Sequence, residues 1–521
     1  MTTRLLTLLA LLGPLLACSS APATPHDTPD AADTADAGAS DADLPDTPQP
    51  TEDTTPEPDG WWTAEPDRCG PDEIRATSER YVPPAPPTDL GETPRVLWTT
   101  NRICKGDVSE QIRGETAYGP LTIDGVTEPR LAVMHYAFRG DVIEANPELV
   151  GTLDAHTGQE LHCLDLLSDE TSTVPYLLIA PDLGRYFVAY ETNSNQGASG
   201  FKAGPQNPAS FWPIAFNHRG IHLSTPGTWV MSQQGQALLS ANNRHLVSYD
   251  AITGQRLWAK DPQTDWHIPF INAKTAGVWA RVDHAAPDEL LVSVTAEQRI
   301  RGPSESGLFK LDICGQIEPL YNGLLAQNVV RLSNGDHVGL VLNGGAETIA
   351  LAYWKDWKII HKVEGCSAYA VLSDDRVACI MRTTTSLWPP NIEIHDFVNE
   401  PVTIDMGGEG TAVSMWLTIG AGDMLVAGGQ WTEPSGELRI GMFFIRPPYA
   451  EVERFDLGWR PGQTGGNLFG PPIIAPDGIL YTSFLDHIYA IQTDIFGLAR
   501  SVYPRSGRGG NANRGHVVLD P

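Results

Sequence analysis

Eight short turns of similar composition recur along the chain, and this recurrence constrains the fold more than any other feature. Each turn joins two short runs rich in β-branched and aromatic residues, as in "RLSNGDHVGLVL" and "IIAPDGILYTSF". Gly, Asn, Asp and Pro in the turns are the residues that tight turns require. The turns are spaced by 40 to 58 residues. Their centres lie near Gly125, Leu183, Gly235, Asp288, Gly335, Asp375, Gly422 and Asp477.

A second hairpin is predicted after each of these turns, most clearly at 149–165, 245–260 and 307–321. Each unit therefore predicts four short strands in about 50 residues, which is the size of a propeller blade. We find no convincing amphipathic helix in 95–505. We predict an all-β fold, an eight-bladed β-propeller of four-stranded antiparallel blades over 95–505, because radial closure leaves no long exposed edge. Packed β-sandwiches are the alternative.

One spacing recurs inside these hairpins. The stretch "HLVSYDAITGQRLWAKD" places Asp250, Gly254 and Trp258 four residues apart, and "LVGTLDAHTGQELHCLD" repeats the first two as Asp154 and Gly158. The Asp and Gly are predicted to shape the turn between the third and fourth strands, where Gly takes a positive φ. Trp258, on the fourth strand, is predicted to pack its ring between neighbouring blades, where burial stabilises the fold.

This spacing resembles the tryptophan-docking motif of PQQ-type propellers, the eight-bladed quinoprotein alcohol dehydrogenase-like superfamily. His162 stands where the Trp would be in the first copy, and we interpret it as a tolerated variant. The stretch "TPRVLWTT" places Trp98 in a pattern similar to "QRLW". We therefore expect a strand at 95–100 to complete the last blade and join the two ends of the domain. The alternative is that residues 499–503 supply this strand.

The resemblance does not extend to the chemistry of alcohol-oxidising members. Those members use two adjacent cysteines, a calcium site and an Asp base, and this sequence contains no adjacent cysteines and no matching motif. Motifs of serine hydrolases and zinc proteases, GxSxG and HExxH, are also absent from the sequence. We therefore assign no catalytic, cofactor-binding or metal-binding residue, although a carboxylate pair could meet in the central channel.

The N-terminus predicts export. Residues 1–17 contain Arg4 and then an apolar run, Leu5 to Leu16, interrupted by Gly13-Pro14. This run is too short to cross a hydrocarbon layer of about 30 Å and is typical of a signal peptide. Leu15-Leu16-Ala17-Cys18 resembles the lipobox of bacterial lipoproteins, which implies cleavage before Cys18 and lipidation of its thiol. An ordinary signal peptide is the alternative.

The segment that follows is strongly acidic. Residues 19–67 contain 13 Asp or Glu and no Lys or Arg, so we expect a disordered tether over 18–67. A pre-propeller segment at 68–94 precedes the propeller, and a C-terminal tail covers 506–521. The formal net charge of −29 argues against nucleic acid as a partner.

Six cysteines remain if Cys18 is lipidated, and an even number in an exported chain allows disulfides. Cys69 and Cys104 bracket the segment before the repeats, and we predict that they pair. Cys366 and Cys379 flank the turn "SDDR" and are the second predicted pair, although a tight hairpin would not place them directly opposite each other.

Two functions from different classes fit the sequence. We favour a non-catalytic, lipid-anchored platform that binds an envelope protein or a glycan, which looks like the propeller lipoproteins that assist assembly of outer-membrane barrels. The alternative is an enzyme with a site in the central channel, either a PQQ-dependent dehydrogenase or a hydrolase. Ser19 follows Cys18 in place of the Asp that retains lipoproteins in the inner membrane. We therefore expect attachment to the outer membrane, facing the periplasm or the exterior.

The anchor can be tested by replacing its thiol. We expect Cys18→Ser to move the exported protein from the membrane fraction to the soluble fraction, because acyl chains contribute about 0.8 kcal/mol per buried CH₂. Fractionation of cell envelopes with immunodetection measures this. A variant that still sediments with the membranes would contradict lipidation at Cys18.

Overall fold

The strands of the described residues all belong to antiparallel sheets. The described residues lie in one compact unit, residues 58–521, whereas the predicted signal peptide (1–17) and tether (18–67), Cys18 included, lie outside them. Among the described residues, no helix has the length and apolar character to span a membrane. The computed structural model describes residues 68–69, 91–101, 116–137, 146–165, 176–180, 185–191, 198–204, 210–215, 229–231, 236–241, 245–250, 256–271, 275–286, 289–298, 305–323, 325–342, 349–382, 391–407, 411–458, 470, 472–484 and 487–506.

The strands form four-stranded sheets, which we number in chain order. Sheets 1 to 4 comprise β2 (Thr116–Ile123), β3 (Val126–Ala137), β4 (Asn146–Asp154) and β5 (Glu160–Asp165); β6 (Tyr176–Ala180), β7 (Arg185–Glu191), β8 (Ala198–Gly204) and β9 (Ser210–Ala215); β10 (Trp229–Met231), β11 (Gln236–Ala241), β12 (His245–Asp250) and β13 (Arg256–Lys260); and β14 (Thr275–Ala286), β15 (Glu289–Gln298), β16 (Glu305–Leu311) and β17 (Ile317–Gly323).

Sheets 5 to 8 follow the same order, except that the first strand of the chain completes the last sheet. They comprise β18 (Leu325–Arg331), β19 (His337–Leu342), β20 (Ile349–Lys355) and β21 (Lys358–Glu364); β22 (Cys366–Val371), β23 (Val377–Met381), β24 (Asn391–His395) and β25 (Val402–Asp405); β26 (Ala412–Gly420), β27 (Met424–Thr432), β28 (Leu438–Ile445) and β29 (Val452–Asp456); and β30 (Ile473–Ile474), β31 (Ile479–Phe484), β32 (His487–Gln492) and β1 (Arg95–Thr100).

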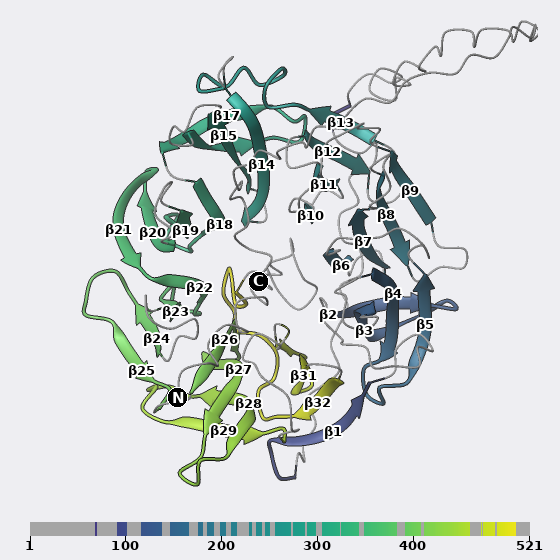
Figure 1. Ribbon diagram of the computed structural model, residues 1–521, viewed down its shortest axis with the longest axis vertical. Coiled ribbons are helices and arrows are strands. Elements are labelled where there is room, and N and C mark those ends of the chain that lie inside the picture. The colour runs from purple at the N-terminus through teal and green to yellow at the C-terminus, as the bar shows by residue number, and fades with distance from the viewer. Residues whose placement is uncertain are drawn as a thin grey trace, which may run out of the picture. The chain divides into compact units, whose positions relative to one another are not determined.

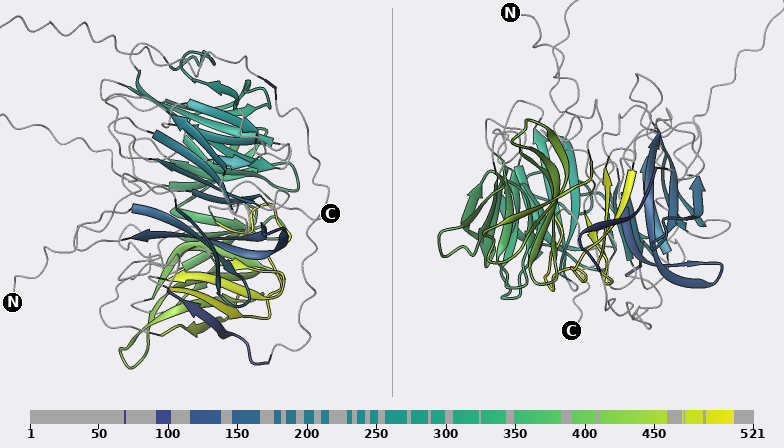
Figure 2. Two further views of the ribbon diagram at one scale, coloured as in Figure 1. Left: turned by 90° about the vertical axis from the view of Figure 1, so that its right-hand side faces the viewer. Right: turned by 90° about the horizontal axis from the view of Figure 1, so that it is seen from below.

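The sheets have the arrangement of a β-propeller. Figure 1 shows them side by side around a common centre, with the first strand of each sheet inward and the fourth outward. Figure 2 shows the same sheets from two other sides. The all-β propeller fold predicted from the repeat is therefore confirmed at the level of its fold class.

The predicted turns lie between the first and second strands. Gly125, Gly335 and Gly422 have φ of 80°, 88° and 74°, and Asp375 has φ of 68°. Asp477 precedes Gly478, whose φ is 86°. The turns predicted at these five positions are therefore confirmed. The predicted turns near Leu183, Gly235 and Asp288 lie outside the described residues.

The apolar core lies in layers between successive sheets. One layer joins Leu246 and Trp258 of sheet 3 to Val292 of sheet 4, and another joins Ile473 of sheet 8 to Leu131 of sheet 1. Similar layers join sheets 4 and 5, 5 and 6, 6 and 7, and 7 and 8. Sheets 4 to 8 each take part in two of these layers and so bury both of their faces, and cohesion there comes mainly from contacts between sheets.

The two ends of the domain share one sheet. Strand β1 pairs antiparallel with β32, with Trp98 opposite Ala490 and Thr100 opposite Ile488. This confirms the strand expected at 95–100. The alternative, residues 499–503, is wrong, because the main chain there runs along β26 instead: the Ala499 amide donates to the Ile419 carbonyl oxygen at 2.8 Å.

The predicted docking tryptophans lie between sheets. The Trp258 indole donates to the Ile313 carbonyl oxygen at 2.8 Å and its side chain is fully buried. A Cβ added to Gly315 would lie 2.9 Å from this ring. Trp98 is placed in the same way, and its indole donates to the Ala155 carbonyl oxygen at 3.2 Å. Each Trp thus lies flat on the turn between the third and fourth strands of the next sheet.

The Asp of the predicted motif builds the receiving turn. One carboxylate oxygen of Asp154 accepts hydrogen bonds from the amides of His156 and Thr157, at 3.1 and 2.8 Å. Gly158 follows with φ of 70°. In the copy with Trp258, Asp250 ends β12 opposite Gln236, and Gly254 lies outside the described residues.

One predicted disulfide is wrong. Cys69 bonds to Cys314, with a Cα–Cα distance of 4.2 Å, and not to Cys104, which lies outside the described residues. The Arg68 amide also donates to the Leu257 carbonyl oxygen at 2.8 Å, so this segment is fixed where sheets 3 and 4 meet. The prediction relied on the short distance between Cys69 and Cys104 in the sequence. That distance is a weak guide, because the entropic cost of closing a loop rises only slowly with the length of the loop.

The second predicted disulfide is present. Cys366 on β22 bonds to Cys379 on β23 with a Cα–Cα distance of 5.4 Å. The two are diagonal rather than opposite, because Cys366 pairs with Met381 and a register shift follows before Ala368. Cys163 is disulfide-bonded as well.

The contribution of the docked ring can be measured directly. We expect Trp258→Ala to lower the free energy of unfolding by about 3–5 kcal/mol, as buried Trp truncations do. Denaturant unfolding followed by circular dichroism measures the loss, with Val126→Ala, at an exposed position of β3, as the control. An unchanged unfolding curve would show that the ring is not docked between sheets.

Candidate functional site

The pairing register defines one docking position on the outermost strand of each of five sheets. In each case the residue pairs with the third strand immediately before a register shift. Trp98 and Trp258 occupy this position in sheets 8 and 3. The complete set, with its partners, is Trp98 with Ala490, His162 with Thr152, Trp258 with Ser248, Tyr321 with Leu308, and His361 with Tyr353.

Histidine replaces tryptophan at two of these positions. His162 was singled out from the sequence, and its pKa is lowered by burial, against the opposing charges of Asp124 and Glu160. His361 was missed, because its hairpin "LAYWKDWKIIHK" has a shorter turn than the motif. Aligning the hairpins on the third-strand residue that precedes the register shift, which is Tyr353 here, would have identified His361. Aligning them on the Asp and Gly of the motif does not.

The turn that faces His361 has also lost its glycine. In sheet 6 an Asp396 oxygen accepts hydrogen bonds from the amides of Val398 and Asn399, at 2.9 and 2.7 Å, as Asp154 does in sheet 1. The residue four positions after Asp396 is Glu400, where the first sheet has Gly158. A Cβ at Gly158 would lie 2.7 Å from the Trp98 ring, so a side chain at this place prevents flat docking.

The outer part of the seam between sheets 5 and 6 therefore lacks a docked tryptophan. His361 is exposed, in contrast to the fully buried Trp258. Phe397 instead crosses the seam and stacks on Tyr353, with ring centroids 4.7 Å apart and an interplanar angle of 29°. His361 lies 6.3 Å from Phe397 and His395 lies 6.4 Å from it, between ring centroids. We call Tyr353, His361, His395 and Phe397 the aromatic cluster.

Backbone geometry fixes the position of Phe397. This residue has φ of 62°, in the left-handed region that bulky residues rarely adopt. The Asp396 carboxylate holds the turn, and its pKa is lowered to about 2 by hydrogen bonds from the Asn399 amide and side chain and from the Val398 amide. The neighbouring Val398 is 86% exposed. An ionised carboxylate thus supports a turn that presents apolar side chains at the surface.

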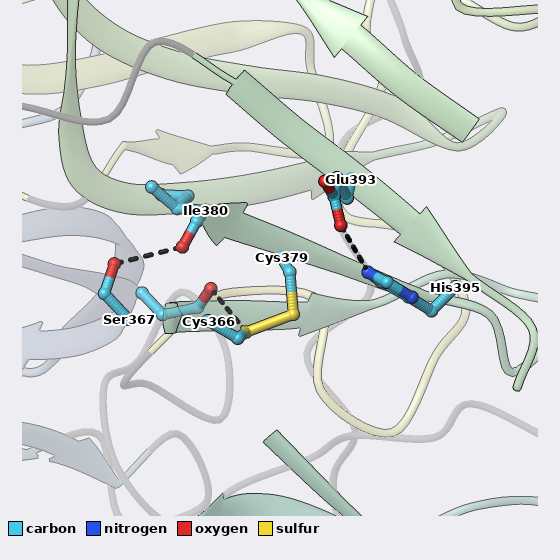
Figure 3. The surroundings of a disulfide bond; sticks show 7 residues. Cys366, Ser367, Cys379, Ile380, Glu393 and His395 are labelled. Atoms are coloured by element: carbon cyan, nitrogen blue, oxygen red, sulfur yellow. Dashed lines mark hydrogen bonds and ion pairs between the residues drawn. A yellow bond between two sulfur atoms is a disulfide. The ribbon is translucent and has the colours of Figure 1, made fainter. Parts of the chain in front are cut away.

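Carboxylates accompany the rings. Glu393 and His395 are joined through Oε2 and Nε2 at 3.1 Å, and Figure 3 shows this pair on β24 beside the Cys366–Cys379 disulfide. Burial lowers the pKa of His395, although the charge and hydrogen bond of Glu393 oppose the shift. The Tyr353 hydroxyl donates to Asp336. Burial and this hydrogen bond raise the pKa of Tyr353, so the phenol stays protonated at neutral pH.

The inner strands of sheets 6 to 8 are covered by the chain itself. The Ser506 amide donates to the Leu417 carbonyl oxygen at 2.8 Å, and the Val371 amide donates to the Tyr503 carbonyl oxygen at 2.7 Å. Tyr503 lies 5.0 Å from the Tyr369 ring. Ser506, which we assigned to the tail, is fully buried. The ordered domain therefore extends at least one residue beyond the predicted boundary at 505.

The inner strands also bring charged groups together. Arg281 on β14 donates to the side-chain oxygens of Gln327 and Asn328, at 2.9 and 2.6 Å, and its Nε lies 3.5 Å from the Asp283 carboxylate. Among the described residues, no group of three or more His, Cys, Asp and Glu could hold a metal ion. Arg281 thus contacts the residues at the register shift of β18, between Gln327 and Val330.

Comparison with known proteins shows no family for this chain. No protein-family model matches the chain, and no curated protein matches it. Among solved structures, the chain is similar to the Dos1 propeller at a TM-score of 0.48 and 10% identity, over 78% of this chain and 97% of that chain.

The aromatic cluster should contribute little to cohesion at the docking position. We expect His361→Ala to change the free energy of unfolding by no more than about 0.5 kcal/mol, because substitutions at exposed positions rarely do more. The same unfolding assay as for Trp258→Ala measures it. A loss comparable to that of Trp258→Ala would mean that His361 is a docking residue and not part of an open seam.

Proposed function

We propose that the sheets close into a propeller of eight blades. Three observations support closure. Strand β1 lies in the sheet of β30, β31 and β32. Apolar layers join sheet 8 to both sheet 7 and sheet 1. Strand β2 of sheet 1 also contacts β6 of sheet 2. An experimental structure with eight sectors would test this proposal, and one with an open gap beside sheet 8 would contradict it.

We further propose that the propeller is a non-catalytic binding platform for an envelope protein or a glycan. The observation that carries this proposal is the open seam between sheets 5 and 6. There, His361 is exposed, and the partly buried rings of Tyr353, His395 and Phe397 lie beside carboxylates in place of a docked tryptophan. Exposed apolar groups beside polar groups are typical of interaction sites, and aromatic residues are enriched where interfaces bind most tightly.

The lipid anchor is part of the same proposal. The lipobox-like sequence at Cys18 and the acidic segment at 18–67 support a propeller held at the outer membrane on a long tether. A tether of this composition stays extended through proline and like-charge repulsion. Such a linker would let the propeller reach partners away from the lipid surface.

The platform proposal is tested in the cell envelope. We expect partners cross-linked to the full-length protein and identified by mass spectrometry to be lost with the double variant His361→Ala, Phe397→Leu. They should be retained with Val126→Ala, which alters an exposed residue of sheet 1. Equal recovery with both variants would contradict binding at this seam.

A further inference from the structure

The seam between sheets 6 and 7 shows what the aromatic cluster lacks. Tyr449, in the turn between the third and fourth strands of sheet 7, has φ of 69°, close to the 62° of Phe397 in sheet 6. The guanidinium carbon of Arg376 lies 6.0 Å from the centre of the Tyr449 ring. This distance is within the range of a cation–π interaction. Tyr449, an aromatic residue with a left-handed backbone conformation, thus has the guanidinium of Arg376 from the preceding sheet over its ring.

In sheet 5, the place that corresponds to Arg376 of sheet 6 is occupied by a residue of opposite charge. The turns "LSNGDH" and "LSDDRV" are equivalent, because the Leu332 amide donates to the Asp336 carbonyl oxygen as the Leu372 amide does to that of Arg376, both at 2.8 Å. Asp336 therefore stands where sheet 6 has Arg376. Instead of supplying a cation to Phe397, sheet 5 supplies a carboxylate bound by Tyr353.

We infer that the aromatic cluster binds an arginine side chain of a partner protein. The inference rests on the proposed platform function and names the chemistry of its partner. The guanidinium would lie against the Phe397 ring, as that of Arg376 lies over Tyr449, and would pair with the carboxylates of Asp336 and Glu393. Arginine fits better than lysine, because its planar group stacks on rings and binds carboxylates through two parallel hydrogen bonds.

The charges around the cluster favour such a ligand. Asp396 is ionised above a pH of about 2 and lies beside Phe397. His395 has a lowered pKa, so it is mainly neutral at pH 7 and does not repel a cation. The formal net charge of −29 would also speed the encounter with a basic partner at low salt.

The test uses a minimal probe. Saturation-transfer NMR of the full-length protein with the tripeptide Ac-Gly-Arg-Gly-NH₂ should show transfer to the arginine side-chain protons, with at least threefold less transfer to the matched Lys and Leu tripeptides. Phe397→Leu, which keeps an apolar side chain but removes the ring, should reduce the signal at least threefold. Glu393→Gln should do the same, and Val126→Ala should leave it unchanged.

Three results would overturn the inference: no transfer to the arginine probe, equal transfer to the Leu probe, or a signal that persists in both Phe397→Leu and Glu393→Gln. A melting curve for each variant shows whether it is folded, and the two variants alter different side chains, so failure of one to fold leaves the other decisive. If envelope partners depend on His361 and Phe397 while the arginine probe does not bind, the platform proposal stands and the arginine inference fails.

Discussion

The fold depends on an indole ring lying flat on a turn that has no side chain in its way. Trp98 on Gly158 and Trp258 on Gly315 each join the outermost strand of one sheet to the next sheet. In each case the indole nitrogen donates to a carbonyl oxygen of the receiving turn. The ring excludes water from a wide area and the hydrogen bond fixes its orientation, so this contact holds the neighbouring sheets together at these two seams.

The absence of this contact shapes the seam between sheets 5 and 6. Where the docking position carries His361 and the receiving turn carries Glu400, a flat contact is impossible, and Phe397 crosses the seam to stack on Tyr353. The inner part of this seam is still held by apolar packing between sheets 5 and 6. The partly buried rings of Tyr353 and Phe397 pack against this apolar layer.

Both ends of the domain are used to hold the sheets together. Strand β1 completes sheet 8, and residues 498–506 run along the inner edge of β26 through paired contacts at Gly420 and Thr418. The Cys69–Cys314 bond fixes the start of the domain to the turn on which Trp258 lies. Any pull on the acidic segment would therefore be borne at the junction of sheets 3 and 4, where the docked ring is fully buried.

The sequence by itself determined the local part of this structure. Alternating apolar residues and turn-forming residues act over a few positions, so they predicted the four-stranded units, the turns at Gly335 and Gly422, and the strand that ends the last sheet. Only the tertiary structure decided the partner of Cys69, the path of the C-terminal residues, and the stacking of Phe397 of sheet 6 on Tyr353 of sheet 5. Those contacts lie outside the pairing of strands within one sheet, so packing selects the partner and the spacing along the chain carries no signal of it.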